Sequence, residues 1–295
     1  MKNDRVMKIQ YYFILFMLVI LTGCGSAKIL PEKKTMASEL SQKGSEYYFK
    51  ADYQKSLDYF SRALMINESI DNREGIARDL NNIGTVYYST NNFDNAMKYF
   101  KEALKIGEEI NDPSVRGSSL NNIGNVLLKK GDIKRAIENF HEALLLDENA
   151  GNKEGTAVRL NNLGLAYNSS GERDKALEFY QKALNINKEL KNLRGQANNL
   201  SNIGMLYEAD GKLEFAIEKY KMALEIDKQI EYLPGIAIDL YNIGHAYEGM
   251  GELNNALTFY NRALKVNERL GFKERVNTDS ESIKRIQEAM GKRGK

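Results

Sequence analysis

The sequence has few of the residues that build cross-links, metal sites and rigid turns: one cysteine, two histidines and three prolines in 295 residues. A single cysteine, Cys24, excludes an intrachain disulfide. His141 and His245 stand far apart in the sequence, and His245 with Glu248 offers fewer ligands than a metal site needs. No phosphate-binding glycine loop and no nucleophile–base pair is present. The sequence therefore predicts no metal, no cofactor and no enzymatic activity.

The chain also lacks an excess of charge of either sign. Its formal net charge is +2, and residues 1–23 hold three basic residues and one acidic residue, so the remainder carries 39 of each. A nucleic-acid-binding protein needs a basic field or stripe, which this balance does not supply. We therefore expect no nucleic-acid partner.

Residues 1–23 have the pattern of a secretion signal. Basic residues precede an apolar run, Tyr11–Leu21, which as a helix spans roughly 17 Å and is too short for a hydrocarbon core of about 30 Å. The next residues, Leu21-Thr22-Gly23-Cys24, resemble the bacterial lipoprotein box. The resemblance implies that Cys24 becomes an acylated N-terminus carrying fatty acids such as palmitate. An ordinary signal with an incidental cysteine, or an uncleaved anchor, are the alternatives.

The residue after the cysteine and the segment beyond it complete this prediction. Gly25 in place of aspartate implies, by the same resemblance, the outer membrane of a two-membraned cell, with the protein facing the periplasm, or the cell surface of a single-membraned one. Residues 24–36 then form the lipidated cysteine and a polar tether that contains Pro31.

Self-similarity at a fixed period is the strongest signal in the sequence. The segment LNNIG begins at Leu80 and recurs as LNNIG, LNNLG, LSNIG and LYNIG at intervals of 40 residues, with a weaker copy, LSQKG, at Leu40. In the second copy the apolar and small residues Leu80, Ile83, Gly84 and Tyr87 have helical spacing, and Ala96, Phe100, Ala103 and Leu104 repeat it. Each repeat is therefore predicted to be a hairpin of two helices.

Small residues punctuate each predicted hairpin. A glycine in the middle of a helix costs about 1 kcal/mol relative to alanine, so its recurrence indicates a close approach between helices. We expect Gly84 to face Ala96 across the hairpin, with an aromatic residue, Phe100, packing one turn away, and the same arrangement in the four repeats that follow. Glycines in the predicted turns favour a left-handed backbone; they are Gly131, Gly171, Gly211 and Gly251. The other prolines, Pro113 and Pro234, are expected in linkers between repeats.

This pattern resembles the tetratricopeptide repeat: leucine, an apolar residue, glycine and tyrosine on the first helix, and alanine, an aromatic residue and alanine on the second. The resemblance covers residues 37–272, although the family's usual proline at the end of the second helix is absent. It implies an all-α, right-handed α-solenoid of about six antiparallel helix hairpins, with residues 273–295 as a capping helix and basic tail. The 40-residue period resembles the subclass found in animal polarity scaffolds and bacterial peptide-sensing regulators.

One polar position recurs on the first helices. Asparagine stands two residues before each mid-helix glycine, and in three repeats the preceding residue is asparagine as well; these residues are Asn82, Asn122, Asn162, Asn202, Asn242, Asn81, Asn121 and Asn161. Because asparagine is a mediocre helix former, the enrichment calls for a reason. One amide matches the N–H and C=O of a peptide unit, and asparagines at this place in similar solenoids bind ligand backbone. The alternative is that each amide bonds to a neighbouring repeat.

Other positions that flank the asparagines change along the chain. Arg78 and Tyr88 mark the N-terminal end, and Glu208 and Glu248 the far end, which would suit a ligand with apolar and basic side chains. The sequence thus predicts a lipid-anchored adaptor that binds an extended peptide or protein segment in a concave groove and assists envelope complex assembly. A self-assembling scaffold, and hence a homo-oligomer, and a sensor of small secreted peptides are the alternatives.

Overall fold

The computed structural model describes residues 30–293, which are helical apart from the short turns between helices. The signal segment, Cys24 and Gly25 lie outside the described residues. Within the part that the structure describes, no strand occurs, and no helix has both the length and the apolar character that a membrane span requires. The chain divides into two compact units, Met1–Val126 and Leu127–Lys295, and each is described by itself.

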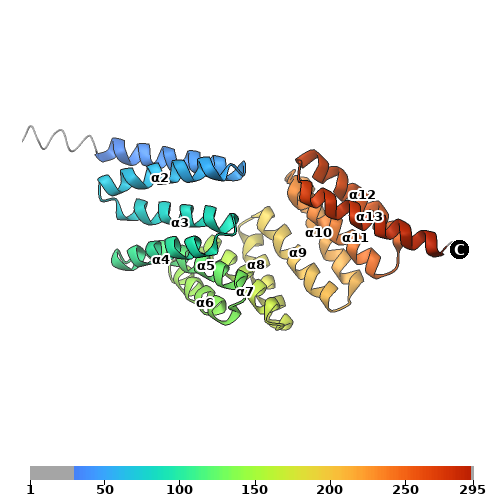
Figure 1. Ribbon diagram of the computed structural model, residues 1–295. Coiled ribbons are helices and arrows are strands. Elements are labelled where there is room, and N and C mark those ends of the chain that lie inside the picture. The colour runs from blue at the N-terminus through green and yellow to red at the C-terminus, as the bar shows by residue number, and fades with distance from the viewer. Residues whose placement is uncertain (1–29, 294–295) are drawn as a thin grey trace, which may run out of the picture. The chain divides into compact units, whose positions relative to one another are not determined.

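The first unit begins with a helix over residues 30–49. It continues with α2 (Tyr53–Ser69), α3 (Arg73–Ser89) and α4 (Phe93–Glu109), and it ends within α5 (Pro113–Lys129), which runs across the unit boundary. Helix α3 packs against both α2 and α4, its neighbours along the chain (Figure 1). The chain therefore folds back on itself at every turn.

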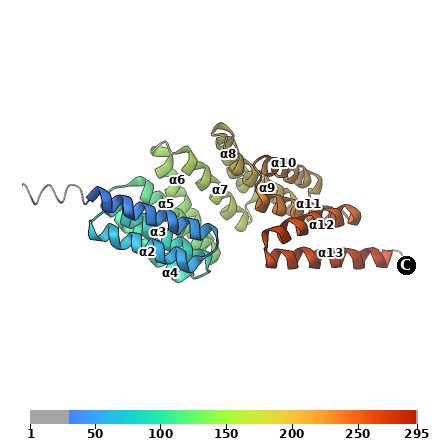
Figure 2. The same cartoon turned by 90° about the horizontal axis from the view of Figure 1, so that it is seen from above.

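The second unit contains the remaining helices. They are α6 (Ile133–Asn149), α7 (Lys153–Ser169), α8 (Arg173–Glu189), α9 (Leu193–Ala209), α10 (Leu213–Gln229), α11 (Leu233–Gly249), α12 (Leu253–Leu270) and α13 (Lys273–Arg293). Each helix packs on the next one in the chain, and α13 lies along α12 at the C-terminal end (Figure 2). The predicted all-α class of consecutive helix hairpins is confirmed. The helix over residues 30–49 and α3, α5, α7, α9 and α11 are called first helices, and α2, α4, α6, α8, α10 and α12 second helices.

Local chemistry sets the helix ends. The predicted turn glycines have the expected left-handed backbone, with φ of +82° at Gly131 and +84° at Gly171. Polar residues then cap the next helix: the Asp132 side chain accepts from the backbone N–H of Arg135, and Asn192 from that of Gly195. Each turn thus ends one helix and starts another.

Within each unit, an aromatic ring of the second helix lies directly on the mid-helix glycine of its hairpin. A Cβ atom added at Gly84 would stand 2.6 Å from the Phe100 ring, and one at Gly164 would stand 2.5 Å from the Tyr180 ring. The prediction that the alanine of the second helix contacts this glycine is therefore wrong. The aromatic residue of the second helix, and not the alanine, requires the glycine, because only a missing side chain leaves room for the ring.

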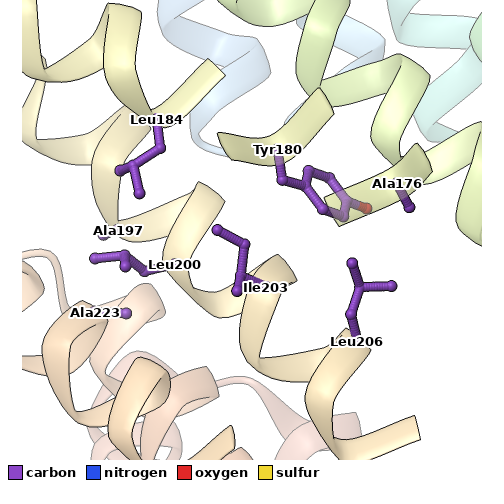
Figure 3. Close-up of a cluster of buried hydrophobic side chains, with 8 residues drawn as sticks. All are labelled: Ala176, Tyr180, Leu184, Ala197, Leu200, Ile203, Leu206 and Ala223. Carbon is purple, nitrogen blue, oxygen red and sulfur yellow. The ribbon is translucent and has the colours of Figure 1, made fainter. Parts of the chain in front are cut away.

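The core continues from each hairpin to the next. Ala176, Tyr180 and Leu184 of α8 pack with Leu200, Ile203 and Leu206 of α9, together with Ala197 and Ala223. Figure 3 shows the Tyr180 ring and Ala176 on one side of this cluster, with Ile203 and Leu206 of the following first helix opposite. Each second helix therefore has two apolar faces, one for its own hairpin and one for the next.

Two expectations about the chain outside the repeats are corrected. Residues 30–36, predicted as part of a polar tether, are helical, and Pro31 lies in that helix, where its carbonyl accepts from Thr35 Oγ1 at 3.0 Å. Pro113 and Pro234 are not in linkers but are the first residue of α5 and the second of α11. Proline is tolerated there because the first N–H groups of a helix have no intrahelical partner.

The glycine–aromatic contact predicts a graded response to added methyl groups. Gly164→Ala should lower the free energy of unfolding by about 1–3 kcal/mol, because its Cβ would overlap the Tyr180 ring. Gly244→Ala should cost less: its Cβ would stand 3.0 Å from the Tyr260 ring, and alanine's better helix propensity offsets about 1 kcal/mol. Urea unfolding of the two variants measures the difference, and equal costs would contradict the steric account.

Candidate functional site

The asparagines predicted from the sequence occupy two adjacent positions on the first helices. The inner row is Asn81, Asn121 and Asn161, and the outer row is Asn82, Asn122, Asn162, Asn202 and Asn242. Asn81 and Asn121 are buried, whereas Asn161 and the whole outer row are half-buried. The two rows therefore have different surroundings and are considered separately.

Within each unit, one member of the inner row joins a first helix to the next one. In the first unit, Asn81 Nδ2 donates to Ser119 Oγ at 2.9 Å, and in the second, Asn161 Oδ1 accepts from Asn199 Nδ2 at 3.0 Å. Asn121 is also engaged by another residue. For Asn81 and Asn161 the structural alternative therefore holds: these amides connect neighbouring repeats, and a ligand-binding role for them stays a prediction.

A smaller share of the asparagines in the outer row than in the inner row forms hydrogen bonds within the described residues. Asn122 Nδ2 donates to Asn81 Oδ1 at 3.4 Å, and Asn202 Nδ2 donates to Asn161 Oδ1 at 2.8 Å. Asn162 has an interaction partner as well. By contrast, the Asn82 and Asn242 side chains make no hydrogen bond to any of residues 30–293. The donor and the acceptor of these two amides are therefore not used within the part of the chain that the structure describes.

A second polar set, which sequence reasoning missed, lies beside the inner row. In this set, a residue near the end of a second helix forms a hydrogen bond or an ion pair with a residue of the following helix. The two residues are twelve positions apart in the sequence. The pairs are Asn67–Asp79 (2.7 Å), Asn187–Asn199 (2.8 Å), Asn267–Asp279 (2.7 Å) and the ion pair Asp147–Arg159 (3.0 Å). We call each pair a junction pair. The signal that could have found them is a polar residue recurring every 40 residues where an apolar face was expected.

Two equivalent pockets open beside these junction pairs in the second unit. One, of about 280 Å³, lies between α7 and α9 and is lined by Val158, Asn161, Asn187, Asn198 and Asn199, among others. The other, of about 210 Å³, lies two repeats further on and is lined by Ile238, Tyr241, Asn242, Asn267 and Asp279, with Ala237, Arg275 and Thr278. Each pocket thus contains one predicted asparagine, Asn161 or Asn242, and one exposed apolar side chain, Val158 or Ile238.

At the N-terminal end, the two predicted flanking residues face different surroundings. Arg78 is exposed and pairs with Glu74 one turn away on the same helix. Tyr88 is half-buried with its ring 5.7 Å from that of Phe93, and burial raises the pKa of its hydroxyl. The structure therefore leaves Arg78 accessible to a ligand and places Tyr88 partly in the core.

At the far end, the two glutamates that suggested a basic ligand are each bonded to a side chain of another helix. Glu208 pairs with His245 and accepts from Tyr220 Oη at 2.6 Å, and the bond to Glu208 raises the pKa of His245. Glu248 accepts two hydrogen bonds from Arg285, at 2.8 and 2.9 Å, which lower the pKa of its carboxyl. The expected acidic end therefore does not form, because its charges tie first helices to their neighbours.

The side chains at this face are mainly amides and apolar groups. Among residues 30–293, no three histidine, cysteine, aspartate or glutamate side chains come together to hold a metal ion. The polar groups at the pockets are amides, the Asp279 carboxyl, two arginines and two hydroxyls, which donate and accept hydrogen bonds.

The fold defines a class of protein made of repeated antiparallel helix hairpins, and the comparisons name the family. The sequence model of the tetratricopeptide repeat matches residues 36–109, 116–189 and 195–269. The chain therefore belongs to the tetratricopeptide repeat family, as the sequence pattern predicted. No curated protein matches the chain in sequence.

Solved structures share the fold at low identity. BtubC from P. vanneervenii is 17% identical with a TM-score of 0.60, over 82% of this chain and 92% of that one. A Rap protein in complex with competence and sporulation factor is 15% identical with a TM-score of 0.65, over 90% and 80%. Aspartyl phosphate phosphatase F from Bacillus subtilis is 14% identical with a TM-score of 0.64, over 80% and 60%. These likenesses show a common helical-repeat architecture.

The division of the asparagines into two rows predicts that truncation to alanine lowers stability at the inner row and leaves it nearly unchanged at Asn242. Asn161→Ala should lower the free energy of unfolding by about 1–3 kcal/mol, because Asn199 and Asn202 lose their shared acceptor. Asn242→Ala should change it by less than about 0.5 kcal/mol. Urea unfolding monitored by circular dichroism measures both, and a larger loss at Asn242 would show that the rows are assigned the wrong way round.

Proposed function

We propose that this protein is a non-catalytic tetratricopeptide scaffold that binds an extended segment of another protein along its first helices. We further propose that it is tethered to a membrane through acylated Cys24 and assists the assembly of envelope complexes. The observation that carries the binding role is the pair of equivalent pockets, at Val158 and Ile238, each with amides and an exposed apolar side chain at its edge.

The amides account for recognition of the ligand's backbone. Asn82 and Asn242 have unused donors and acceptors on the outer row, and each one matches the N–H and C=O of a peptide unit. A typical hydrogen bond of this kind contributes about 0.5–1.5 kcal/mol, so the backbone alone gives modest affinity. Micromolar binding, about −8 kcal/mol, is the expected range once ordering of the peptide is included.

The pockets account for side-chain preference. Val158, Met205 and Ile238 stand on three successive first helices of the second unit, and 48%, 49% and 40% of their surfaces are exposed. Exposed apolar side chains beside amide-lined pockets suit a ligand with apolar side chains at intervals along an extended backbone. Because Glu208 and Glu248 are internally paired, a basic ligand is not required.

Two other roles remain as outcomes of the test. A Rap protein that shares this fold was solved in complex with competence and sporulation factor, and that likeness motivates the alternative proposal that this chain is a sensor of small secreted peptides. A self-assembling scaffold would instead fill the same face with a second copy of the chain.

A photo-crosslinking residue placed at the pockets tests the binding role. With p-benzoylphenylalanine at Val158 or at Ile238, irradiation in cells should covalently trap one partner. The same residue at Leu145 or Phe215, which are 57% and 56% exposed on the second helices α6 and α10, should trap none. Mass spectrometry then distinguishes an envelope protein, a short peptide and a second copy of the chain. Equal trapping at all four positions would overturn a dedicated first-helix face.

The anchor has its own test. Replacing Cys24 by serine removes the thiol that would be acylated, so the protein should move from the membrane fraction to the soluble fraction, and incorporation of labelled palmitate should be lost. Several acyl chains give stable attachment, so the wild-type protein should resist extraction with salt. A Cys24→Ser variant that stays in the membrane would show that another segment anchors the chain.

A further inference from the structure

The junction between α10 and α11 differs from the junctions that surround it. At the four junction pairs named above, the two residues are complementary: an amide faces a carboxylate, an amide faces an amide, or Arg159 faces Asp147. At the same two positions of this junction stand Asp227 and Asp239, again twelve residues apart. Two carboxyl groups therefore occupy positions that hold a donor and an acceptor in each of those four junction pairs.

Both carboxyl groups are removed from water. Asp227 is 4% exposed and Asp239 is 1% exposed. Asp227 Oδ1 and Asp239 Oδ2 are buried and have no hydrogen-bond partner among residues 30–293. A buried carboxylate oxygen without a partner is costly, so the arrangement is unfavourable while both groups are ionised.

The residue that precedes α11 differs from its counterparts, and its side chain supplies no hydrogen-bond donor to this junction. In earlier junctions an asparagine before the first helix donates to the junction residue: Asn152 Nδ2 to Asp147 Oδ1, and Asn192 Nδ2 to Asn187 Oδ1, at 2.7 and 2.9 Å. The equivalent residue here is Tyr232, whose hydroxyl accepts from Arg194 instead, at 2.9 Å. Asp227 therefore loses the amide donor that its counterparts have.

The surrounding groups do not neutralise the pair. From α9, the Ser201 hydroxyl donates to Asp239 Oδ1, and Arg194 acts on Asp227 through its charge only. From α10, Tyr220 is the other titratable group that interacts with Asp239, and its hydroxyl is bonded to Glu208. No arginine pairs with these aspartates as Arg159 pairs with Asp147.

We infer that Asp227 and Asp239 share a proton. This proton forms the hydrogen bond between α10 and α11 that an amide hydrogen forms in three of the other junction pairs. Protonation is the response expected of carboxyl groups that are buried without a cationic partner. It turns one carboxyl group into a hydrogen-bond donor and so restores the complementary pairing. The junction is thus a pH-sensitive contact between two repeats, and this inference does not depend on the ligand proposed above.

The titration of the two groups agrees with this geometry. Burial raises the pKa of Asp227 to about 6, with Arg194 opposing. Burial raises the pKa of Asp239 to about 7, with Ser201 opposing and Asp227 adding to the rise. Because both folded pKa values lie above the ordinary value of 3.8, the folded state holds more protons than the unfolded state. The stability of the junction should therefore fall as pH rises from about 4 to about 7.

Asparagine at position 239 tests the inference, because it supplies permanently the donor that the proton supplies at low pH. The Tm of the Asp239→Asn variant should exceed that of the wild type by several degrees at pH 8, and the difference should shrink toward zero at pH 5. Asp174→Asn, on the exposed surface of α8, is the matched control and should shift Tm equally at both pH values.

Placing two aspartates at another junction should make the stability of that junction depend on pH in the same way. The Asn187→Asp, Asn199→Asp double variant should lower Tm at pH 8 and recover part of the loss at pH 5. Carbon-13 NMR of the aspartate carboxyl carbons in the wild-type protein gives a direct readout that does not depend on a variant's folding. Titration of both Asp227 and Asp239 below about pH 5, or a Tm gain in Asp239→Asn that is the same at pH 5 and pH 8, would overturn the shared proton.

Discussion

Side-chain hydrogen bonds that cross from one repeat to the next hold consecutive hairpins in register. The Asn161 carboxamide accepts from both Asn199 and Asn202 of the following first helix, and Asn199 also accepts from Asn187 at the end of the intervening second helix. Apolar packing alone is non-directional and tolerates sliding, whereas a buried amide must meet a partner in one geometry. The polar contacts therefore specify how each repeat meets the next.

The same requirement explains which residues remain for function. A side chain committed to a neighbouring repeat is costly to withdraw, since its partner would be left buried and unpaired. Residues at the ends of the network or just outside it, such as Asn82 and Asn242, carry no such cost. The proposed binding face and the observed inter-repeat contacts are thus built from adjacent positions of one helix.

The repeat period, the hairpins and the turn glycines could be predicted from the sequence because they depend on local spacing. The partner of Gly84 could not, since the offset between two packed helices depends on how they cross, and the structure selects Phe100. Adjacent asparagines point about 100° apart on a helix, so which row meets the next repeat depends on how the repeats rotate. Two linked substitutions show the same constraint. Gly107 replaces the usual polar junction residue, and Val115 replaces the glycine that faces it in other repeats. A Cβ added at Gly107 would stand 2.8 Å from the Val115 side chain.

The most direct test of this account is a double-mutant cycle on Asn161 and Asn199, with unfolding free energies measured for both single alanine variants and the double variant. If the two amides form the contact that fixes neighbouring repeats, their coupling energy should be at least about 0.5 kcal/mol. The pair Asn161 and Asn267, which shares no partner, should be additive. Additivity within about 0.3 kcal/mol for Asn161 and Asn199 would contradict the account.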